Sequence, residues 1–208
     1  SKVKPSAQPD PAASVSPASP ADTLLSEGFE NGVMPPAGWQ AVSNSSSVRK
    51  WTLVNSTTNP SYVHTGAYAG WVNYDAAANQ DEWLISPSFA VVAGAPTSVS
   101  FWADSDTNYP TANMQLLAID AGGTFTDTLW DMVADETWST FTYRQITKDL
   151  SAYQGKTIRL AWHYYGLDGE SFGLDDILVT GPTAGSCTPN ALPWVSAVPV
   201  SGTTAAAG

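Results

Sequence analysis

The chain has 208 residues, and 8 Lys and Arg against 19 Asp and Glu give it a formal charge of −11. This acidic balance argues against nucleic acid as a partner, because phosphate recognition needs clustered basic side chains. With 43% hydrophobic and 11% aromatic residues, the chain can build a sizeable core. Its apolar runs are well short of a membrane span. The single cysteine, Cys187, excludes an internal disulfide framework.

The first 22 residues are rich in Pro, Ala and Ser and contain five prolines. We therefore expect residues 1–22 to be a linker, stiffened locally by proline. Spacers of this composition are common in secreted proteins with several domains, which favours an extracellular setting. We expect any signal peptide to have been removed or to lie upstream.

From Leu24 onward, short apolar stretches alternate with clusters of Gly, Pro, Asn, Asp and Ser. The clearest stretch is 157–165, in which Ile158, Leu160, Trp162 and Tyr164 fall on one face with the two-residue period of a strand. Strands are predicted near 24–30, 39–42, 51–54, 68–73, 82–86, 97–103, 113–120, 127–133, 138–146, 156–165 and 173–180. The only helix-like piece is 149–155, one turn at most before a glycine. The pattern predicts an all-β chain, a jelly-roll-type antiparallel β-sandwich with flanking Pro/Ala/Ser-rich linkers.

Beyond residue 180 the chain becomes rich in Gly, Pro, Thr and Ala again. We therefore expect the compact domain to span 23–182. Residues 183–208 are predicted to be a linker or the first strand of a following β domain. Trp194 in this tail is too apolar to stand free in water, so we expect it to be buried against this domain, a next domain or another copy.

Five phrases in the compact region occur in the order found in one known family. They are EGFENGVMPPAGW (27–39), DEWLISPSF (81–89), SVSFWA (98–103), DLSAYQGKTIRLAWHY (149–164) and FGLDDILV (172–179). Over residues 24–180 the chain resembles the cleaved-adhesin or choice-of-anchor J domain of bacterial secreted and surface proteins. This family is similar in fold to MAM and galactose-binding-like jelly rolls. The resemblance implies a β-sandwich accessory module, often calcium-bound and attached to exported proteins, without implying one ligand.

Catalytic interpretations of the sequence are weak. GESFG (169–173) matches a nucleophile elbow around Ser171, but a strand follows it and no histidine lies beyond it. His64 and His163 are the only histidines, too few for a three-histidine site. Carboxylate pairs that could hydrolyse glycosides are plentiful, yet acidic loops are also what an acidic secreted domain shows.

The chain has nine tryptophans, eight of them within the compact region, which is many for so small a domain. Trp83 and Trp162 alternate with core-type residues, so we expect both to pack in the core. Trp102 points opposite to Val99 and Phe101 and faces either a second layer or solvent. Exposed aromatic rings would stack on sugar faces and make the domain a carbohydrate-binding module.

The final predicted strand carries two adjacent carboxylates, Asp175 and Asp176, among apolar residues. By alternation Asp175 shares a face with Ile177 and Val179, so at least one carboxylate should be largely buried. Because few basic residues are available to pair it, a calcium ion with oxygen ligands is the expected solution. The alternative is that Asp175 accepts backbone N–H bonds at a bulge.

The first strand supplies Glu27 and Glu30, and the family resemblance implies calcium near the Glu of FE and the Asp pair. Asp81 is a weaker candidate ligand. The predicted metal ligands are therefore Glu27, Glu30, Asp175, Asp176 and Asp81.

We expect a non-catalytic extracellular or cell-surface accessory module for adhesion within a larger bacterial protein. One alternative is a carbohydrate-binding module, and another is a subunit of an extracellular polymer assembled through its tail. The expected partners are neighbouring domains of the same polypeptide, a glycan or surface protein, or copies of the chain itself.

Overall fold

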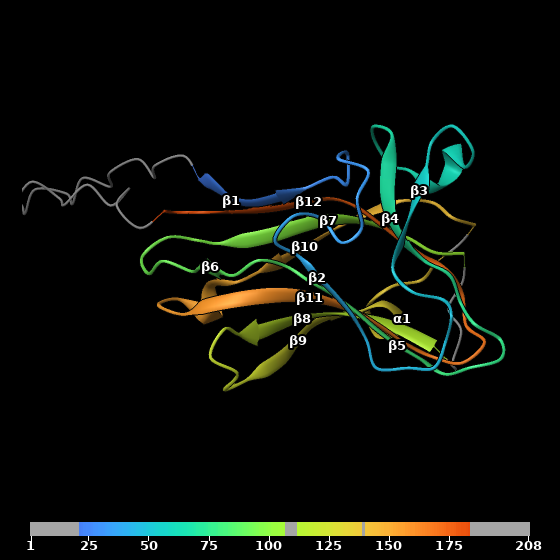
Figure 1. Cartoon of the computed structure of the whole chain (residues 1–208). Coiled ribbons are helices and arrows are strands. Elements are labelled where there is room, and N and C mark those ends of the chain that lie inside the picture. The colour runs from blue at the N-terminus through green and yellow to red at the C-terminus, as the bar shows by residue number, and fades with distance from the viewer. Residues whose placement is uncertain (1–20, 107–111, 139, 184–208) are drawn as a thin grey trace, which may run out of the picture.

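A computed structural model describes residues 21–106, 112–138 and 140–183 of the chain. These residues form two six-stranded antiparallel sheets, which lie one above the other in Figure 1. Sheet A has the order β10–β7–β12–β4–β3, with β1 also paired to β12, and sheet B has the order β2–β5–β11–β8–β9, with β6 also paired to β11. The predicted jelly-roll β-sandwich is confirmed.

The strands of sheet A are β1 (Asp22–Glu27), β3 (Thr52–Asn55), β4 (Tyr68–Val72), β7 (Ser98–Asp104), β10 (Arg144–Asp149) and β12 (Phe172–Gly181). The strands of sheet B are β2 (Gln40–Ser43), β5 (Gln80–Ile85), β6 (Phe89–Ala90), β8 (Ala112–Asp120), β9 (Thr126–Asp131) and β11 (Thr157–Gly166). The helical pieces are α1 (Met132–Asp135) and the 3-10 turns η1 (Pro60–Tyr62) and η2 (Ser151–Tyr153). None of the helices in the described ranges is long and apolar enough to cross a membrane.

Strand β11 divides its side chains between the core and the surface as the two-residue period predicts. Ile158, Leu160, Trp162 and Tyr164 are all fully buried between the sheets. Among the alternate residues, Arg159, His163 and Tyr165 stay partly exposed on the outer side of sheet B, whereas Ala161 is buried. The strand thereby fixes both an interior layer and an outer surface.

Aromatic rings fill the core between the sheets. Phe101 of β7 contacts Trp130 of β9 and Trp162 of β11 edge to face, each at 5.5 Å between ring centroids. This arrangement matches the positive ring edge of one partner to the negative face of the other. Burial of each such side chain stabilises the fold by about 2–3 kcal/mol. The expectation that Trp162 packs in the core is confirmed.

Two strands have different boundaries from those predicted: one ends earlier and the other begins later. The strand expected over 127–133 stops at Asp131, because its carboxylate accepts hydrogen bonds from the backbone N–H groups of Val133 and Ala134 and caps α1. The strand expected over 138–146 begins only at Arg144. Thr140 and Phe141 before it have φ of 48° and 42°, which is incompatible with extended backbone.

Strand β12 contains a β-bulge at the paired aspartates. Asp176 has φ of 45°, and the register with β7 shifts between Asp175 and Leu178. The extra residue reverses the alternation, so Ile177 and Val179 face the core while Asp175 lies opposite Trp102 on the outer face of sheet A. The prediction that Asp175 shares a face with Ile177 and Val179 was therefore wrong. The prediction that one carboxylate is buried is confirmed, since Asp175 is fully buried.

The two ends of the described domain lie side by side. Asp22 at the start of β1 pairs with Gly181 at the end of β12, and the Thr183 hydroxyl donates to Asp22 Oδ2 at 2.8 Å. Both flanking segments therefore join the sandwich at the same end. The linker predicted over 1–22 extends too far, because β1 already begins at Asp22. Residues 1–20 of that linker, residues 184–208 of the tail predicted over 183–208, and the predicted burial of Trp194 lie outside the described residues.

Candidate functional site

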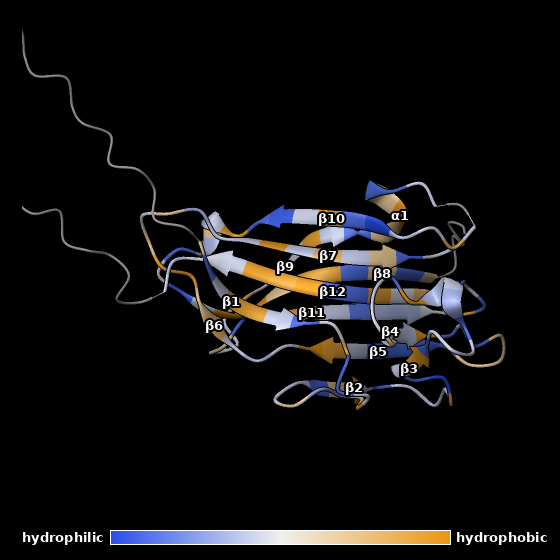
Figure 2. Ribbon diagram, turned by 90° about the horizontal axis from the view of Figure 1, so that it is seen from above, coloured by the Kyte–Doolittle hydropathy of each residue, from blue (hydrophilic) through white to orange (hydrophobic). Residues whose placement is uncertain are grey.

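Four of the five predicted metal ligands lie in the region where β1 meets the bulge of β12. Glu27 pairs with Ile177 across the two strands, which places it beside Asp176. A Cβ built on Gly28 would lie 3.5 Å from Asp176 Oδ1 and 3.9 Å from Glu30 Cγ. The glycine thus leaves a small space between these carboxylate-bearing side chains. We call Glu27, Glu30, Asp175 and Asp176 the acidic cluster. Figure 2 shows the setting, in which hydrophobic colour along much of β12 is interrupted by blue.

Asp175 holds the loop that follows η1 against sheet A. Its Oδ2 accepts the backbone N–H groups of His64 at 3.1 Å and Thr65 at 3.2 Å, and its Oδ1 accepts that of Asp176 at 2.8 Å. Burial raises the pKa of Asp175 to about 6, although the backbone hydrogen bonds oppose the shift. Acceptance of backbone N–H bonds at a bulge is thus the geometry observed for Asp175.

Asp176 is bound by side chains of the same loop. The Thr65 hydroxyl lies 2.9 Å from each carboxylate oxygen of Asp176, and His64 Nδ1 lies 2.7 Å from Oδ2. The His64 ring also stacks on Trp102 at 3.8 Å between centroids. Trp102 therefore faces a second layer made by the loop, one of the two positions expected for it.

Glu30 of the acidic cluster contacts the chain that follows Gly66. Its carboxylate accepts the backbone N–H groups of Ala67 at 2.9 Å and Tyr68 at 3.2 Å. Gly66 lies directly against this carboxylate, since a Cβ there would be 2.3 Å from Glu30 Oε1. The loop can therefore approach Glu30 this closely only with glycine at position 66.

The composition of the acidic cluster fits a hard cation. Its four side chains offer carboxylate oxygens, and among the described residues its only ion-pair partner is His64. Within the same part of the chain, no three His, Cys, Asp or Glu side chains converge closely enough to hold a metal ion by themselves. A cation here would also need the Thr65 hydroxyl, backbone carbonyls or water as ligands.

Asp81, the fifth predicted ligand, belongs to a different part of the molecule. It lies in β5 of sheet B, where its Oδ1 is 2.6 Å from Trp83 Nε1 and 2.8 Å from His163 Nε2. Partial burial opposes ionisation, yet the hydrogen bonds from Trp83 and His163 hold the pKa of Asp81 below its usual value. The structure does not bring Asp81 to the acidic cluster.

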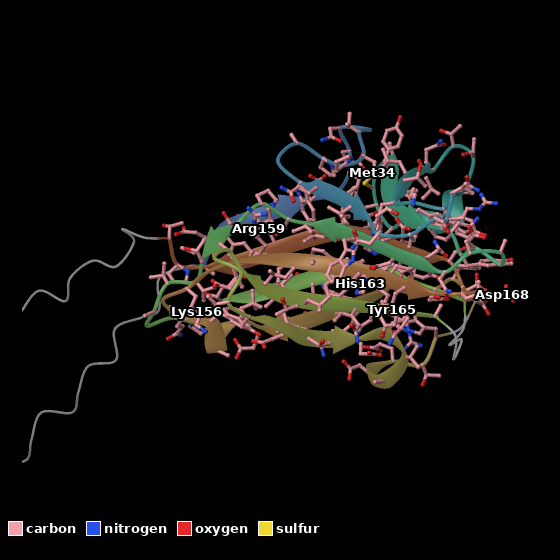
Figure 3. All side chains as sticks on the ribbon, turned by 60° about the horizontal axis from the view of Figure 1, so that its bottom comes forward. Met34, Lys156, Arg159, His163, Tyr165 and Asp168 are labelled. Atoms are coloured by element: carbon pink, nitrogen blue, oxygen red, sulfur yellow. The ribbon has the colours of Figure 1, made fainter. Side chains whose placement is uncertain are left out.

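The two rings that Asp81 orients stack on each other on the outer face of sheet B, next to Tyr165. Trp83 and His163 stack at 3.7 Å between centroids with 13° between their planes, and His163 lies 4.9 Å from Tyr165. We call Trp83, His163 and Tyr165 the aromatic strip. Figure 3 shows His163 and Tyr165 on the face of sheet B that is turned forward. Burial lowers the pKa of His163, although its hydrogen bond to Asp81 opposes the shift.

Trp83 was expected to pack in the core, and this was wrong. Its neighbours Glu82 and Leu84 point inward instead, with 1% and 0% of their surface exposed. Glu82 tolerates this position because Ser43 and Ser45 donate hydrogen bonds to its carboxylate. Sequence alone does not lead one to expect a buried glutamate. The prediction therefore assigned Trp83 to the core face of β5, whereas Glu82 occupies that face. The pairing of Trp83 with His163 in the β5–β11 register is the signal that identifies the strip.

Polar side chains of β8 and β9 border the aromatic strip. Gln115 pairs with His163 and Asn113 pairs with Tyr165 in the sheet register. Both amides donate to the Asp131 carboxylate, at 2.9 Å and 2.8 Å respectively. Flat apolar rings beside fixed polar groups are suited to bind a sugar ring, which presents C–H groups on its face and hydroxyls at its edge.

The remaining catalytic candidate does not have the arrangement that its motif requires. Ser171 Oγ donates to Asn73 Oδ1 at 2.6 Å, and strand β12 rather than a helix begins at Phe172.

The fold and these surfaces define a jelly-roll module of the type found in surface proteins and in carbohydrate-binding modules. The chain belongs to the Cleaved Adhesin Domain family, whose model matches residues 22–179. It is 26% identical to Hemagglutinin A of Porphyromonas gingivalis W83 over 191 residues, covering 83% of this chain and 9% of that protein. The chain thus spans about a tenth of the length of this curated relative.

Two solved structures illustrate the similarity in fold. The K3 cleaved adhesin domain of Lys-gingipain from Porphyromonas gingivalis W83 has a TM-score of 0.57 at 25% identity, covering 78% of this chain and 99% of that chain. TmCBM61, solved in complex with beta-1,4-galactotriose, has a TM-score of 0.54 at 20% identity, covering 73% of this chain and 92% of that chain. The fold is therefore shared with both an adhesin domain and a carbohydrate-binding module.

Proposed function

We propose that the chain is a non-catalytic extracellular adhesion module that binds a glycan through the aromatic strip. The observation that carries this proposal is the stack of Trp83, His163 and Tyr165 on the outer face of sheet B. Aromatic side chains whose only role is to fill the hydrophobic core would lie between the two sheets. Here three neighbouring rings lie on the outer face, next to amide and carboxylate groups that can hydrogen-bond sugar hydroxyls.

Two findings from the comparisons support this proposal. TmCBM61 has the same fold and was solved with a galactose oligosaccharide bound. Hemagglutinin A, by its name, is an adhesive protein, and the matched segment is a small part of it. We infer that this chain likewise acts beside other domains of a larger bacterial surface or secreted protein. Its two ends lie side by side, so the domain would project from that protein with the far end of the sandwich outward.

We further propose that the acidic cluster holds a structural calcium ion. Glu30 and Asp176 would supply carboxylate oxygens, with Glu27 and Asp175 beside them. The support is that this cluster lacks any Lys or Arg ion pair within the described residues. When bound, calcium would neutralise charge between the end of β1, the bulge and the 64–68 loop. Its role would be to stabilise these segments, not to take part in a reaction.

The glycan proposal is tested by array screening of the purified chain, followed by calorimetry on the best ligand. Trp83→Ala and Tyr165→Ala should each weaken binding by about tenfold or more, as expected for central aromatic anchors. Tyr74→Ala is the matched control, because Tyr74 is an exposed aromatic residue (39%) outside the strip. Equal affinity of the strip variants and the wild type would contradict the proposal, as would the absence of glycan binding.

A further inference from the structure

A hollow lies at the β3–β4 edge of sheet A, on the other sheet from the aromatic strip. Its volume is about 410 Å³, within the range of small-ligand sites. The residues that line it include Arg49, Lys50, Trp51, Thr52, Trp71 and Asn73. No acidic residue lines it, although acids outnumber bases 19 to 8 in the chain. Arg49 and Lys50 are thus the only charged side chains among the described residues that line the hollow.

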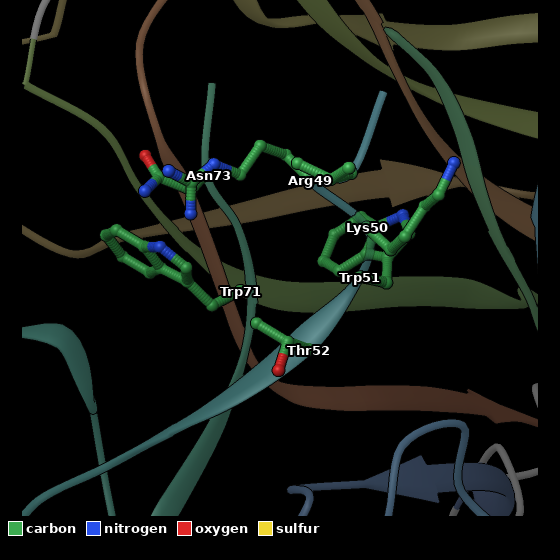
Figure 4. A pocket seen from close by; sticks show the side chains of 7 residues that line it. Arg49, Lys50, Trp51, Thr52, Trp71 and Asn73 are labelled. Carbon is green, nitrogen blue, oxygen red and sulfur yellow. The ribbon is translucent and has the colours of Figure 1, made fainter. Parts of the chain in front are cut away.

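The polar groups of this hollow are held in place by buried hydrogen bonds. Gln80, 3% exposed, donates from Nε2 to the backbone carbonyls of Arg49 at 3.1 Å and Asn73 at 3.0 Å. Ser171 Oγ donates to Asn73 Oδ1 at 2.6 Å, so the Asn73 amide keeps its Nδ2 donor for another partner. Figure 4 shows the Arg49 side chain extending toward Asn73 and Trp71, while Lys50 extends to the other side.

The Arg49 guanidinium has no hydrogen-bond or ion-pair partner among the described residues. Lys50, by contrast, pairs with Glu82 at 3.5 Å. The nearby Asp75 carboxylate accepts the Ser47 hydroxyl at 2.7 Å and the Ala77 backbone N–H at 2.9 Å, and these hydrogen bonds lower the pKa of Asp75 more than the Arg49 charge does. Arg49 therefore presents an uncommitted planar donor beside two indole rings.

We propose that this hollow binds the carboxylate of an acidic sugar. A guanidinium and an amide N–H on one rim match the two oxygens of a carboxylate, which Arg binds with two parallel hydrogen bonds. Trp51 and Trp71 also line the hollow, and the small part of each ring that is exposed, 6% of its surface, would contact the C–H groups of the attached pyranose. This site is on the other sheet from the aromatic strip, so the inference is independent of glycan binding there.

The test is calorimetric titration of the full chain with glucuronate and galacturonate, against glucose and galactose as neutral counterparts. The uronates should bind and the neutral sugars should bind at least about tenfold more weakly, since the charged contact is lost. Arg49→Gln and Asn73→Asp should each weaken uronate binding by about tenfold or more. Asn73→Asp keeps the acceptor for Ser171 but replaces the free N–H donor by a second oxygen. Arg159→Gln is the matched control, because it removes an arginine from the other sheet.

Four results would overturn the inference. They are the absence of uronate binding, unchanged affinity in Arg49→Gln, loss of uronate binding in Trp83→Ala, and equally tight binding of a blocked glutamate tripeptide. The third would place the uronate on the aromatic strip, and the fourth would show that the hollow selects a carboxylate without the sugar. If Trp83→Ala and Tyr165→Ala bind neutral glycans as tightly as the wild type, only the glycan binding proposed for the aromatic strip is contradicted.

Discussion

The carboxylate of Asp81 and the imidazole of His163 form a 2.8 Å contact across neighbouring strands of sheet B. The same oxygen of Asp81 accepts the Trp83 indole N–H at 2.6 Å, so one carboxylate orients both stacked rings. Two rings fixed in this way lose little further conformational freedom when a ligand binds. The relationship makes Asp81 a positioning residue for the proposed glycan surface, and its influence on His163 can be measured without any ligand.

Asp81→Asn should lower the pKa of His163. Burial already lowers this pKa, and the hydrogen bond and charge of Asp81 act against burial by favouring the protonated ring. Without the negative charge of Asp81, less favours the protonated ring, and the effect of burial on the His163 pKa becomes larger. The titration of His163, followed by NMR, should therefore move to lower pH. Asp120→Asn, at the far end of β8, is the control and should leave the titration in place. A higher His163 pKa in Asp81→Asn would contradict this account.

Gly66→Ala should destabilise the protein more than Gly123→Ala. The two glycines have similar φ, +70° and +77°, so the cost of a left-handed alanine, about 1 kcal/mol, is shared. At Gly123 a Cβ meets nothing within 4 Å, whereas at Gly66 it would be 2.3 Å from Glu30 Oε1. Displacement of Glu30 from the N–H groups of Ala67 and Tyr68 should cost roughly 1–3 kcal/mol more.

Urea unfolding of both variants measures this difference, and a double variant isolates its cause. In a Glu30→Ala background the penalty of Gly66→Ala should fall to that of Gly123→Ala, because the clashing carboxylate is gone. An unchanged penalty in that background would mean that the contact with Glu30 is not responsible.

The strand pattern and the fold class were predictable from the sequence because the two-residue period survives in most strands. Strand β11 is the clearest case, with four buried residues at alternate positions. The orientation of side chains near the site was not predictable for two physical reasons. A bulge at Asp176 inserts one residue and reverses the alternation, and the Asp pair indicated a bulge only as the alternative to a calcium site. In β5, inward-facing Glu82 inverts the usual rule that charged side chains face solvent.

The candidate site was predictable only in part for a related reason. Glu27, Glu30 and the Asp pair could be grouped because the first and last strands of the sandwich are neighbours. The aromatic strip, however, depends on the exact register of β5 against β11, which brings Trp83 to His163 across 80 residues of sequence. The Arg49 hollow likewise depends on Gln80 bridging two backbone carbonyls, a contact that no spacing reveals.

Calcium should raise the melting temperature of the wild-type chain, and a chelator should lower it again. At a calcium concentration a hundredfold above Kd, the expected stabilisation is about 2.7 kcal/mol. Glu30→Gln and Asp176→Asn should abolish most of this response, because each removes a carboxylate ligand from the acidic cluster. Asp81→Asn should retain it, because Asp81 belongs to sheet B. A melting temperature that calcium and chelator leave unmoved would exclude the site.

Asp104→Asn should stabilise the protein at pH 8 and leave it nearly unchanged at pH 4. Asp104 is fully buried, and neither carboxylate oxygen has a hydrogen-bond partner within the described part of the chain. Burial, followed by the nearby charge of Asp106, raises the pKa of Asp104 to about 7. Below pH 4 the carboxyl is protonated in both the folded and the unfolded state, so its titration contributes nothing to stability. Between about pH 4 and 7 the unfolded state releases this proton first, so stability falls as the pH rises.

The loss is complete above about pH 7, where its upper bound is about 4 kcal/mol for a shift of roughly three pKa units. Asparagine has no proton to lose, so the free energy of unfolding of Asp104→Asn, measured by urea titration, should exceed that of the wild type by a few kcal/mol at pH 8. Asp106→Asn is the graded control, because it removes only the smaller cause of the shift and should give a smaller gain. A gain of equal size at pH 4 and pH 8 would show that packing, not ionisation, is responsible. Destabilisation by Asp104→Asn at pH 8 would instead mean that the buried carboxylate has a stabilising partner.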